Sequence, residues 1–285
     1  MINYGGSGGM DFSGIDVALL TDLFLIILQV GILVKSLNLT LSNLDQWMAT
    51  TKTRLPLVFF PATGKVLPEP LGIVLMLSSW NYPISLALDP LIGAIAIENT
   101  VVLKPSELAP ACSALIANMI PSYMDDKAVM VVKGEASVGK QLLYQKWDKI
   151  FFTGSPRVGR IVMSTAVKHL TPVTLELGGK CPVIIELIKK TIKRFHGDNP
   201  KEPKNIARIV NKQHFERLSS LLQDPVVTAS IVHGGSLNEE KIIFPSSFPL
   251  RTIDPTILLD PRLDAEFMTE EIFGPLLPNS IARLV

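Results

Sequence analysis

Charged residues and cysteines are scarce in this sequence, and each shortage excludes a class of function. Charged residues make up 19% of the 285 residues, and 27 Lys and Arg nearly cancel 26 Asp and Glu. This balance gives no field to attract nucleic acid or an acidic membrane surface, so we expect no nucleic-acid partner. Two cysteines cannot form a disulfide framework and indicate a reduced, cytoplasmic chain. They share no metal-ligand spacing with the four histidines, so no metal site is expected.

Basic residues are also missing near the N-terminus, and this excludes a secretory signal, which needs a positively charged start. Residues 17–34 are almost wholly apolar and long enough to cross a membrane. Asp22 lies inside this run, and a carboxylate in the hydrocarbon core is costly. A buried helix or a mis-joined segment is therefore favoured, and membrane association is not expected.

Apolar residues are abundant, at 47% of the chain, and between residues 71 and 186 they follow two alternating patterns. Short runs of strand length, such as residues 71–77 and 100–105, are separated by stretches with helical period. This alternation predicts an α/β fold in which a parallel, Rossmann-like sheet has helices on both faces. Ligands bind such sheets beyond the carboxyl ends of the strands, so the residues just after each strand are the candidates for chemistry.

Beyond residue 186 the order of elements is less regular. Residues 206–222 have the period of a helix, and residues 230–237 and 255–260 have the character of strands. The expected parts are an N-terminal helical region over 1–55, atypical over 1–34, a dinucleotide-binding domain over 56–186, and a truncated second α/β lobe over 187–285.

Two of the strand ends carry side chains that the residues alone explain in more than one way. After the first strand, Asn81 is able to donate its amide to a developing oxyanion, although an Asn that breaks a strand before Pro83 is the favoured interpretation. After the second strand, helix initiation with Ser106 as N-cap explains the sequence around Lys104 and Glu107. The alternative is that this lysine and this acid hydrogen-bond a nucleotide ribose.

Two further strands end in glycine-containing turns. In "FFTGSPRVG", Gly154 permits a tight turn, Ser155 is a suitable helix cap, and Pro156 fits the first helical position. A helix starting there presents N–H groups to a pyrophosphate, although the Gly-Xaa-Gly-Xaa-Xaa-Gly fingerprint is missing. In "ELGGK", Glu176 precedes two glycines that let the backbone approach a ligand, and a turn with a surface carboxylate is the equal alternative.

Five stretches together resemble the aldehyde dehydrogenase superfamily, in particular its class 3 branch in a plant-like form. In order, they are "SSWNYP", "NTVVLKPSELAP", "KIFFTGSPRVGR", "PVTLELGGKCP" and "TEEIFGP". The resemblance begins near residue 35 and runs to about residue 278. It implies an oxidoreductase of cellular aldehyde metabolism, homodimeric in the family, that oxidises aldehydes to carboxylic acids with NAD, or with NADP in some relatives of this branch.

For catalysis, the resemblance implies that Asn81 supplies the oxyanion-hole amide and that Glu176 is the general base that activates water. In the family a cysteine thiolate adds to the aldehyde, a hydride passes to NAD, and water releases the acid. The nucleophile belongs in a Gly-Gln-Xaa-Cys segment downstream of the base, and this sequence has no such segment. Cys112 and Cys181 match other positions, so we interpret both as packed thiols.

For the cofactor, the resemblance implies three groups of contacts. Lys104 and Glu107 would contact the adenosine ribose, and Glu271 and Phe273 would place the nicotinamide ribose and ring. The turn and helix start beside the nucleotide would be formed by Gly154, Ser155, Val158 and Gly159.

The resemblance is interrupted between Glu186 and Leu187, at the place where the nucleophile segment belongs, and it stops before the family's final third. We therefore expect an aldehyde dehydrogenase polypeptide that has lost its covalent chemistry. Two alternatives remain open. The chain is either a pseudoenzyme that binds a nucleotide or a partner through the retained sheet, or a mis-assembled gene product.

Overall fold

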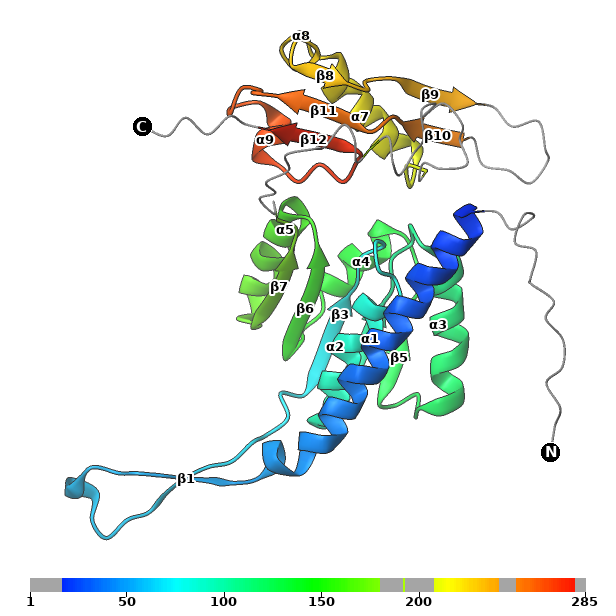
Figure 1. Cartoon of the computed structure of the whole chain (residues 1–285). Helices are drawn as coiled ribbons and strands as arrows, with labels where there is room; N and C mark the ends of the chain where they lie inside the picture. Colours follow the sequence, from blue (N-terminus) through cyan, green and yellow to red (C-terminus); the bar gives the residue numbers. More distant parts are fainter. Residues whose placement is uncertain (1–16, 180–191, 193–207, 241–249, 280–285) are drawn as a thin grey trace, which may run out of the picture. The chain divides into compact units, whose positions relative to one another are not determined.

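The computed structural model describes residues 17–179, 192, 208–240 and 250–279 (Figure 1). The chain divides into two compact units, which we call the sheet unit (Leu25–Gly178) and the second unit (Gly179–Val285 with Met1–Phe24). The expected N-terminal region is not set apart as a unit of its own, because from Leu25 onward it belongs to the sheet unit. The expected boundary at residue 186 lies outside the described residues.

Five strands form the sheet of the sheet unit, in the order β5-β4-β3-β6-β7. Every neighbouring pair in it is parallel. The strands are β3 (Ile73–Leu77), β4 (Thr100–Lys104), β5 (Val129–Val131), β6 (Lys149–Gly154) and β7 (Val173–Leu177). The predicted parallel sheet is therefore confirmed. A further strand expected over residues 181–186 lies outside the described residues.

Helices cover both faces of this sheet. They are α2 (Ser85–Ala96), α3 (Pro110–Tyr123), α4 (Ala136–Leu143) and α5 (Pro156–Ala166). Val74 and Met76 of β3 pack into one cluster with α2 and α3, whereas Leu75 packs into another with α4 and α5. Alternate strand residues point to opposite faces, so burial on both faces explains why these strands are continuously apolar.

The apolar run near the N-terminus forms a long helix, α1 (Val17–Met48). Between Leu25 and Met48 it is long and apolar enough to cross a membrane by length and composition, and little of this stretch is buried. The expectation of a buried helix is therefore wrong for residues 25–34, the part of the run whose burial is described. Gln29 is an exception, because its side chain is buried and its Oε1 accepts the backbone N–H groups of Ile84 (3.0 Å) and Ser85 (3.2 Å). In this structure α1 is thus bonded to the start of α2.

An antiparallel pair, β1 (Thr51–Thr53) and β2 (Gly64–Val66), follows α1 and extends away from the sheet in Figure 1. A short 3₁₀ turn, η1 (Leu57–Phe59), lies between the two strands, and a second one, η2 (Val167–His169), follows α5. The apolar side chains around η1 are largely exposed to solvent.

The described part of the second unit contains three helices and two small sheets around its own core. Its helices are α7 (Lys212–Gln223), α8 (Pro225–Thr228) and α9 (Glu266–Thr269). Its strands are β8 (Ile231–His233), β9 (Leu237–Glu240), β10 (Leu250–Ile253), β11 (Thr256–Leu259) and β12 (Leu276–Asn279). One sheet has the order β12-β11-β8 and the other pairs β10 with β9. Leu218, Leu258 and Phe267 are almost fully buried in the core between them and α7.

Two expectations for the second unit are corrected. The helix expected over 206–222 begins at Lys212, because the Asn211 side chain accepts the N–H of His214 and caps it there. The single strand expected over 230–237 is two strands, because Gly234 and Gly235 turn the chain with φ of 76° and 92°. The strand expected over 255–260 is confirmed as β11.

Candidate functional site

The carboxyl ends of the parallel strands bring several predicted residues to one edge of the sheet. Asn81 lies in the loop after β3, Lys104 ends β4, and Gly154 ends β6. Glu176 lies in β7, where it is the register partner of Thr153 in β6. Because β4, β3, β6 and β7 are consecutive neighbours in the sheet, these positions follow one another along the same edge. This is the edge at which parallel sheets bind ligands.

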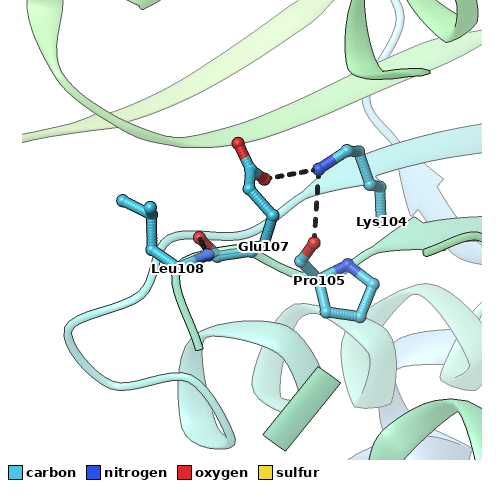
Figure 2. Close-up of polar contacts among 5 residues, drawn as sticks. Lys104, Pro105, Glu107 and Leu108 are labelled. Carbon is cyan, nitrogen blue, oxygen red and sulfur yellow. Dashed lines mark hydrogen bonds and ion pairs between the residues drawn. The ribbon is translucent and has the colours of Figure 1, made fainter. Parts of the chain in front are cut away.

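An ion pair joins the two residues expected to contact a ribose (Figure 2). Lys104 Nζ lies 2.8 Å from Glu107 Oε2 and 3.4 Å from the carbonyl oxygen of Pro105, to which it also donates. The lysine side chain is only 7% exposed, whereas that of Glu107 is 36% exposed. A buried ammonium is thus paired with a carboxylate that solvent, or a ligand, is able to reach.

The helix-initiation interpretation of this segment is wrong. α3 begins at Pro110, with Ala109 as its N-cap, and Ser106 instead accepts the N–H of Leu108 in a turn (3.3 Å). Pro110 has no N–H and disfavours helical geometry in the residue before it, which favours a helix start at Pro110 itself. Glu107 is consequently free of a helical turn and is directed at Lys104.

A glycine that sequence reasoning overlooked lies against this lysine. A Cβ at Gly139 of α4 would lie 3.5 Å from Cδ and from Cε of Lys104, so the aliphatic stem of the lysine packs directly on the helix backbone. A larger side chain at this position would meet the stem. The signal in the sequence was an isolated glycine within a helical pattern, which often marks such close packing.

At the end of β6 the chain turns into α5 as predicted. Ser155 caps the helix by accepting the N–H of Val158 (3.4 Å), and Pro156 occupies the first turn. Gly159 is buried, and a Cβ there would lie 3.0 Å from Leu177 Cδ2. Pro156 has no N–H, and the N–H groups of Val158 and Gly159 are already bonded to Ser155. A phosphate at this turn would therefore meet the helix dipole and the Ser155 hydroxyl more than free amides.

The loop after β3 holds the candidate oxyanion-hole amide. Asn81 is exposed, and its Oδ1 accepts a hydrogen bond from the Ser79 hydroxyl (2.5 Å), which leaves the Nδ2 group as the outward donor. Ser78, at the start of the loop, has a buried hydroxyl oxygen with no hydrogen-bond partner among the described residues. A buried hydroxyl without a partner is costly, and a bound ligand is one way to satisfy it.

The residues expected near the nicotinamide lie in the second unit. Glu271 and Phe273 belong to the turn between α9 and β12. Phe273 has a φ of 49°, and its backbone oxygen is bonded to His214 Nε2 at 2.8 Å. The structure therefore places the candidate residues in two separate groups, one in each unit.

Cys112, which lies within the described residues, does not have the surroundings of an activated nucleophile. Cys112 is a free thiol in α3, and burial raises its pKa, so the reactive thiolate is disfavoured. Cys181 lies outside the described residues. No group of His, Cys, Asp and Glu able to hold a metal ion occurs within the described ranges.

Comparison with known proteins shows what this architecture is. The sequence pattern of the "Aldehyde dehydrogenase family" matches residues 43–187, about half of the chain and all five strands of the parallel sheet. The chain belongs to the aldehyde dehydrogenase family.

Relatives place it within one branch of that family. Aldehyde dehydrogenase family 3 member F1 of Arabidopsis thaliana is 48% identical over 90% of this chain. Family 3 member H1 of the same plant is 44% identical over 88% of the chain. The chain spans about 60% of the length of these aldehyde dehydrogenases, since the shares covered are 60% and 59%. The class 3, plant-like resemblance is thus confirmed.

Solved structures agree with the family assignment. A structure described as "Substrate bound state of Staphylococcus Aureus AldH" superimposes with a TM-score of 0.77 and 33% sequence identity. The alignment covers 90% of this chain and 63% of that one. The aldehyde dehydrogenase fold is therefore retained over the greater part of the chain.

Proposed function

We propose that this chain binds NAD at the carboxyl edge of its sheet and, as written, does not oxidise aldehydes. Membership of the family supports an enzyme acting on aldehydes with NAD or NADP. The proposal concerns what this chain retains of that activity. The observation that carries it is the contrast between a paired Lys104 and Glu107 and a missing nucleophile segment.

The residues at the sheet edge fit the ribose of a nucleotide. The Glu107 carboxylate is an acceptor for ribose hydroxyls, and the buried Lys104 ammonium is a donor held in place by that carboxylate. The buried, unpartnered Ser78 hydroxyl lies at the end of the neighbouring strand β3. A carboxylate near the 2′ position repels a 2′-phosphate, so we expect NAD to be preferred to NADP.

When bound, the nicotinamide of NAD would accept the hydride that the aldehyde loses on oxidation. The chain's own groups would act on oxygen atoms and water around it. Asn81 would donate a hydrogen bond from Nδ2 to an oxyanion. Glu176, which is exposed in β7, would take a proton from the hydrolytic water. Both roles serve an adduct on a cysteine thiolate, and neither group is able to form that adduct itself.

The binding proposal is tested by titrating the purified chain with NAD and with NADP. We expect tighter binding of NAD, and we expect Glu107→Gln to weaken NAD binding and to narrow the difference between the two. Lys140→Met, an exposed lysine on α4, is the matched control and is expected to change neither affinity. Equal binding of the two cofactors, or an unchanged NAD affinity in the Glu107 variant, would contradict the assignment.

The activity proposal is tested by following NADH formation with a medium-chain and an aromatic aldehyde. Loss of a nucleophile that works with a base and an oxyanion hole lowers kcat by roughly a million-fold, so we expect no turnover above background. The parallel sample carries Cys181→Ser. Turnover that this substitution abolishes would show that Cys181 had taken the nucleophile's role, and the inactive assignment would be wrong.

The mis-assembled gene product is distinguished by sequencing the transcript across the codons for Glu186 and Leu187. A longer message would supply an ordinary enzyme, whereas a message that joins these codons directly leaves a binding protein without turnover. Cytoplasmic location and a homodimeric state remain predictions of the sequence.

A further inference from the structure

The loop between β1 and β2 carries four consecutive apolar side chains into solvent. They are Leu57, Val58, Phe59 and Phe60, and we call residues 57–60 the hairpin tip. All four are exposed, and the exposed fraction reaches 94% for Leu57 and 85% for Phe60. The hairpin belongs to the sheet unit and extends away from its sheet in Figure 1. Exposed apolar patches of this kind mark surfaces that meet a protein or a membrane.

The backbone of the hairpin tip forms its hydrogen bonds largely within the loop itself. Phe59 and Phe60 donate their N–H groups to carbonyl oxygens of the same turn, each at 3.0 Å, and Ala62 donates to Phe59 at 2.7 Å. Pro56 and Pro61 have no N–H group. Unsatisfied backbone groups are what makes a loop costly to place in hydrocarbon. Few such groups oppose the transfer of this tip from water into an apolar medium.

Cationic side chains flank the hairpin tip on both strands. Lys52 of β1 and Lys65 of β2 are register partners, so they lie directly opposite each other, and Arg54 follows β1. All three are exposed, and none has a hydrogen-bond or ion-pair partner in the part of the chain that the structure describes. Residues 46–68 contain no acidic residue to offset them. Like charges in directly opposed positions are destabilising, so an anion bound between the strands would stabilise the hairpin.

The apolar and the cationic groups adjoin each other. A hollow of about 250 Å³ inside the hairpin is lined by Lys52, Leu57 and Phe60, among other residues. A surface that presents anionic groups above hydrocarbon matches this arrangement. Anionic lipids in a bilayer are such a surface, since they attract basic residues to the headgroups and offer acyl chains beneath them.

We propose that the hairpin tip inserts into bilayers that contain anionic lipids. Leu57 and Phe60 enter the acyl region, while Lys52, Arg54 and Lys65 lie among the headgroups. The near-zero net charge of the whole chain, from which no membrane partner was expected, hides this local excess of positive charge. The proposal is independent of the proposed binding of NAD.

A second copy of the chain fits this surface less well. In a two-fold contact between hairpin tips, the cations of one copy would face the same cations of the other, and like-charge contacts oppose binding. A specific protein interface also buries about 800 Å² on each partner, which is more than a four-residue tip offers. Apolar side chains that enter a bilayer each add to binding without such a minimum area.

The first experiment measures cosedimentation of the full chain with vesicles of phosphatidylcholine, with and without about 30% phosphatidylserine. We expect binding to the anionic vesicles that falls between about 0.05 and 0.5 M salt, because salt screens the attraction. Leu57→Ser combined with Phe60→Ser should weaken it at least about tenfold, because both apolar anchors are lost. Leu170→Ser is the matched control, since Leu170 is 88% exposed in the same unit.

Two outcomes of this experiment would overturn the proposal. Equal binding of the double variant and the wild type would assign the membrane contact to another surface, such as the exposed apolar part of α1. Equal binding of the wild type to both kinds of vesicle would remove the role of the cations.

The second experiment replaces single cations at the hairpin. Lys52→Gln and Lys65→Gln should each weaken binding to the anionic vesicles about fivefold. Lys146→Gln, at an exposed lysine away from the hairpin, is the matched control and should leave binding unchanged. An equal loss in all three variants would show that only the net charge matters, and the proposed site would be refuted.

The third experiment separates insertion from adsorption. Phe60→Trp places an indole at the hairpin tip, and the three native tryptophans of the wild type give the background signal. We expect its emission to shift to the blue on addition of anionic vesicles and to be quenched by lipids brominated on their acyl chains. Leu170→Trp should show neither effect. Binding without quenching in Phe60→Trp would mean adsorption alone and would overturn the proposal.

Sedimentation velocity without vesicles tests the alternative occupant. We expect the same sedimentation coefficient for the wild type and for Leu57→Ser combined with Phe60→Ser. A wild-type dimer that the double variant converts to a monomer would make the hairpin tip an interface between copies, and the membrane proposal would be wrong. A chain that binds NAD but no vesicles refutes this proposal alone, whereas a chain that binds vesicles but no NAD refutes only the proposed function.

Discussion

Breaking the ion pair between Lys104 and Glu107 should affect stability very differently depending on which partner is removed. Glu107→Ala leaves the buried ammonium without its carboxylate, with only the 3.4 Å contact to Pro105 remaining. Breaking a fully buried pair costs about 3–5 kcal/mol. Because the Glu107 side chain is 36% exposed and water reaches the pair, we expect a smaller loss of about 1–2 kcal/mol in the free energy of unfolding.

Lys104→Met should cost less, although it removes the same ion pair. The methionine stem can occupy the space over Gly139, and no buried charge remains to be solvated. We expect a stability within about 1 kcal/mol of the wild type. The double variant should have the same free energy of unfolding as Lys104→Met, since the Glu107 carboxylate has no ion-pair partner once the ammonium is absent.

The assay is urea unfolding followed by tryptophan fluorescence. All three tryptophans, Trp47, Trp80 and Trp147, lie in the sheet unit, so the signal reports the unit that contains the pair. NAD binding should be weakened in both single variants, whereas Glu107→Ala should be the less stable of the two. The affinity for NAD and the free energy of unfolding therefore report separate roles of the pair. If Glu107→Ala is no more destabilised than Lys104→Met, or still loses stability in the Lys104→Met background, the reasoning about the buried ammonium is refuted.

Three further predictions concern single side chains. Gln29→Leu should destabilise the sheet unit by about 1–3 kcal/mol, because two N–H groups at the start of α2 lose their acceptor, and an unchanged urea midpoint would contradict this. Gly159→Val should cost about 1–3 kcal/mol in the same assay, because even a Cβ lies 3.0 Å from Leu177, whereas Gly159→Ala should be nearly neutral. His214 has a lowered folded pKa, so below its unfolded value of 6.5 the unfolded chain binds more protons and stability falls with falling pH. Hydrogen exchange of α7 at pH 7.5 and 5.5 should show that fall in the wild type, and His214→Gln should reduce it.

Much of the sheet unit follows from local sequence. Strand-length apolar runs such as 73–77 and 100–104, separated by helical stretches, are enough to predict a parallel sheet, because both faces of each strand must be buried. The turn at Gly154 and Ser155 was likewise predictable, since a glycine, a cap and a proline each have a local conformational preference.

Contacts between distant segments were decided by tertiary structure. Ser106 has the character of an N-cap, yet Pro110 moves the helix start, and Glu107 turns to Lys104. His214 and Arg217 of α7 carry no motif, because their partners are the backbone oxygens of Phe273 and Ile272, more than fifty residues away. Gln29 is similarly indistinguishable from any polar residue in an apolar helix until α2 lies beside it. Local preference determines which elements form, whereas the hydrogen-bond partners of a buried polar group depend on which backbone amides and carbonyls the packed chain leaves unsatisfied.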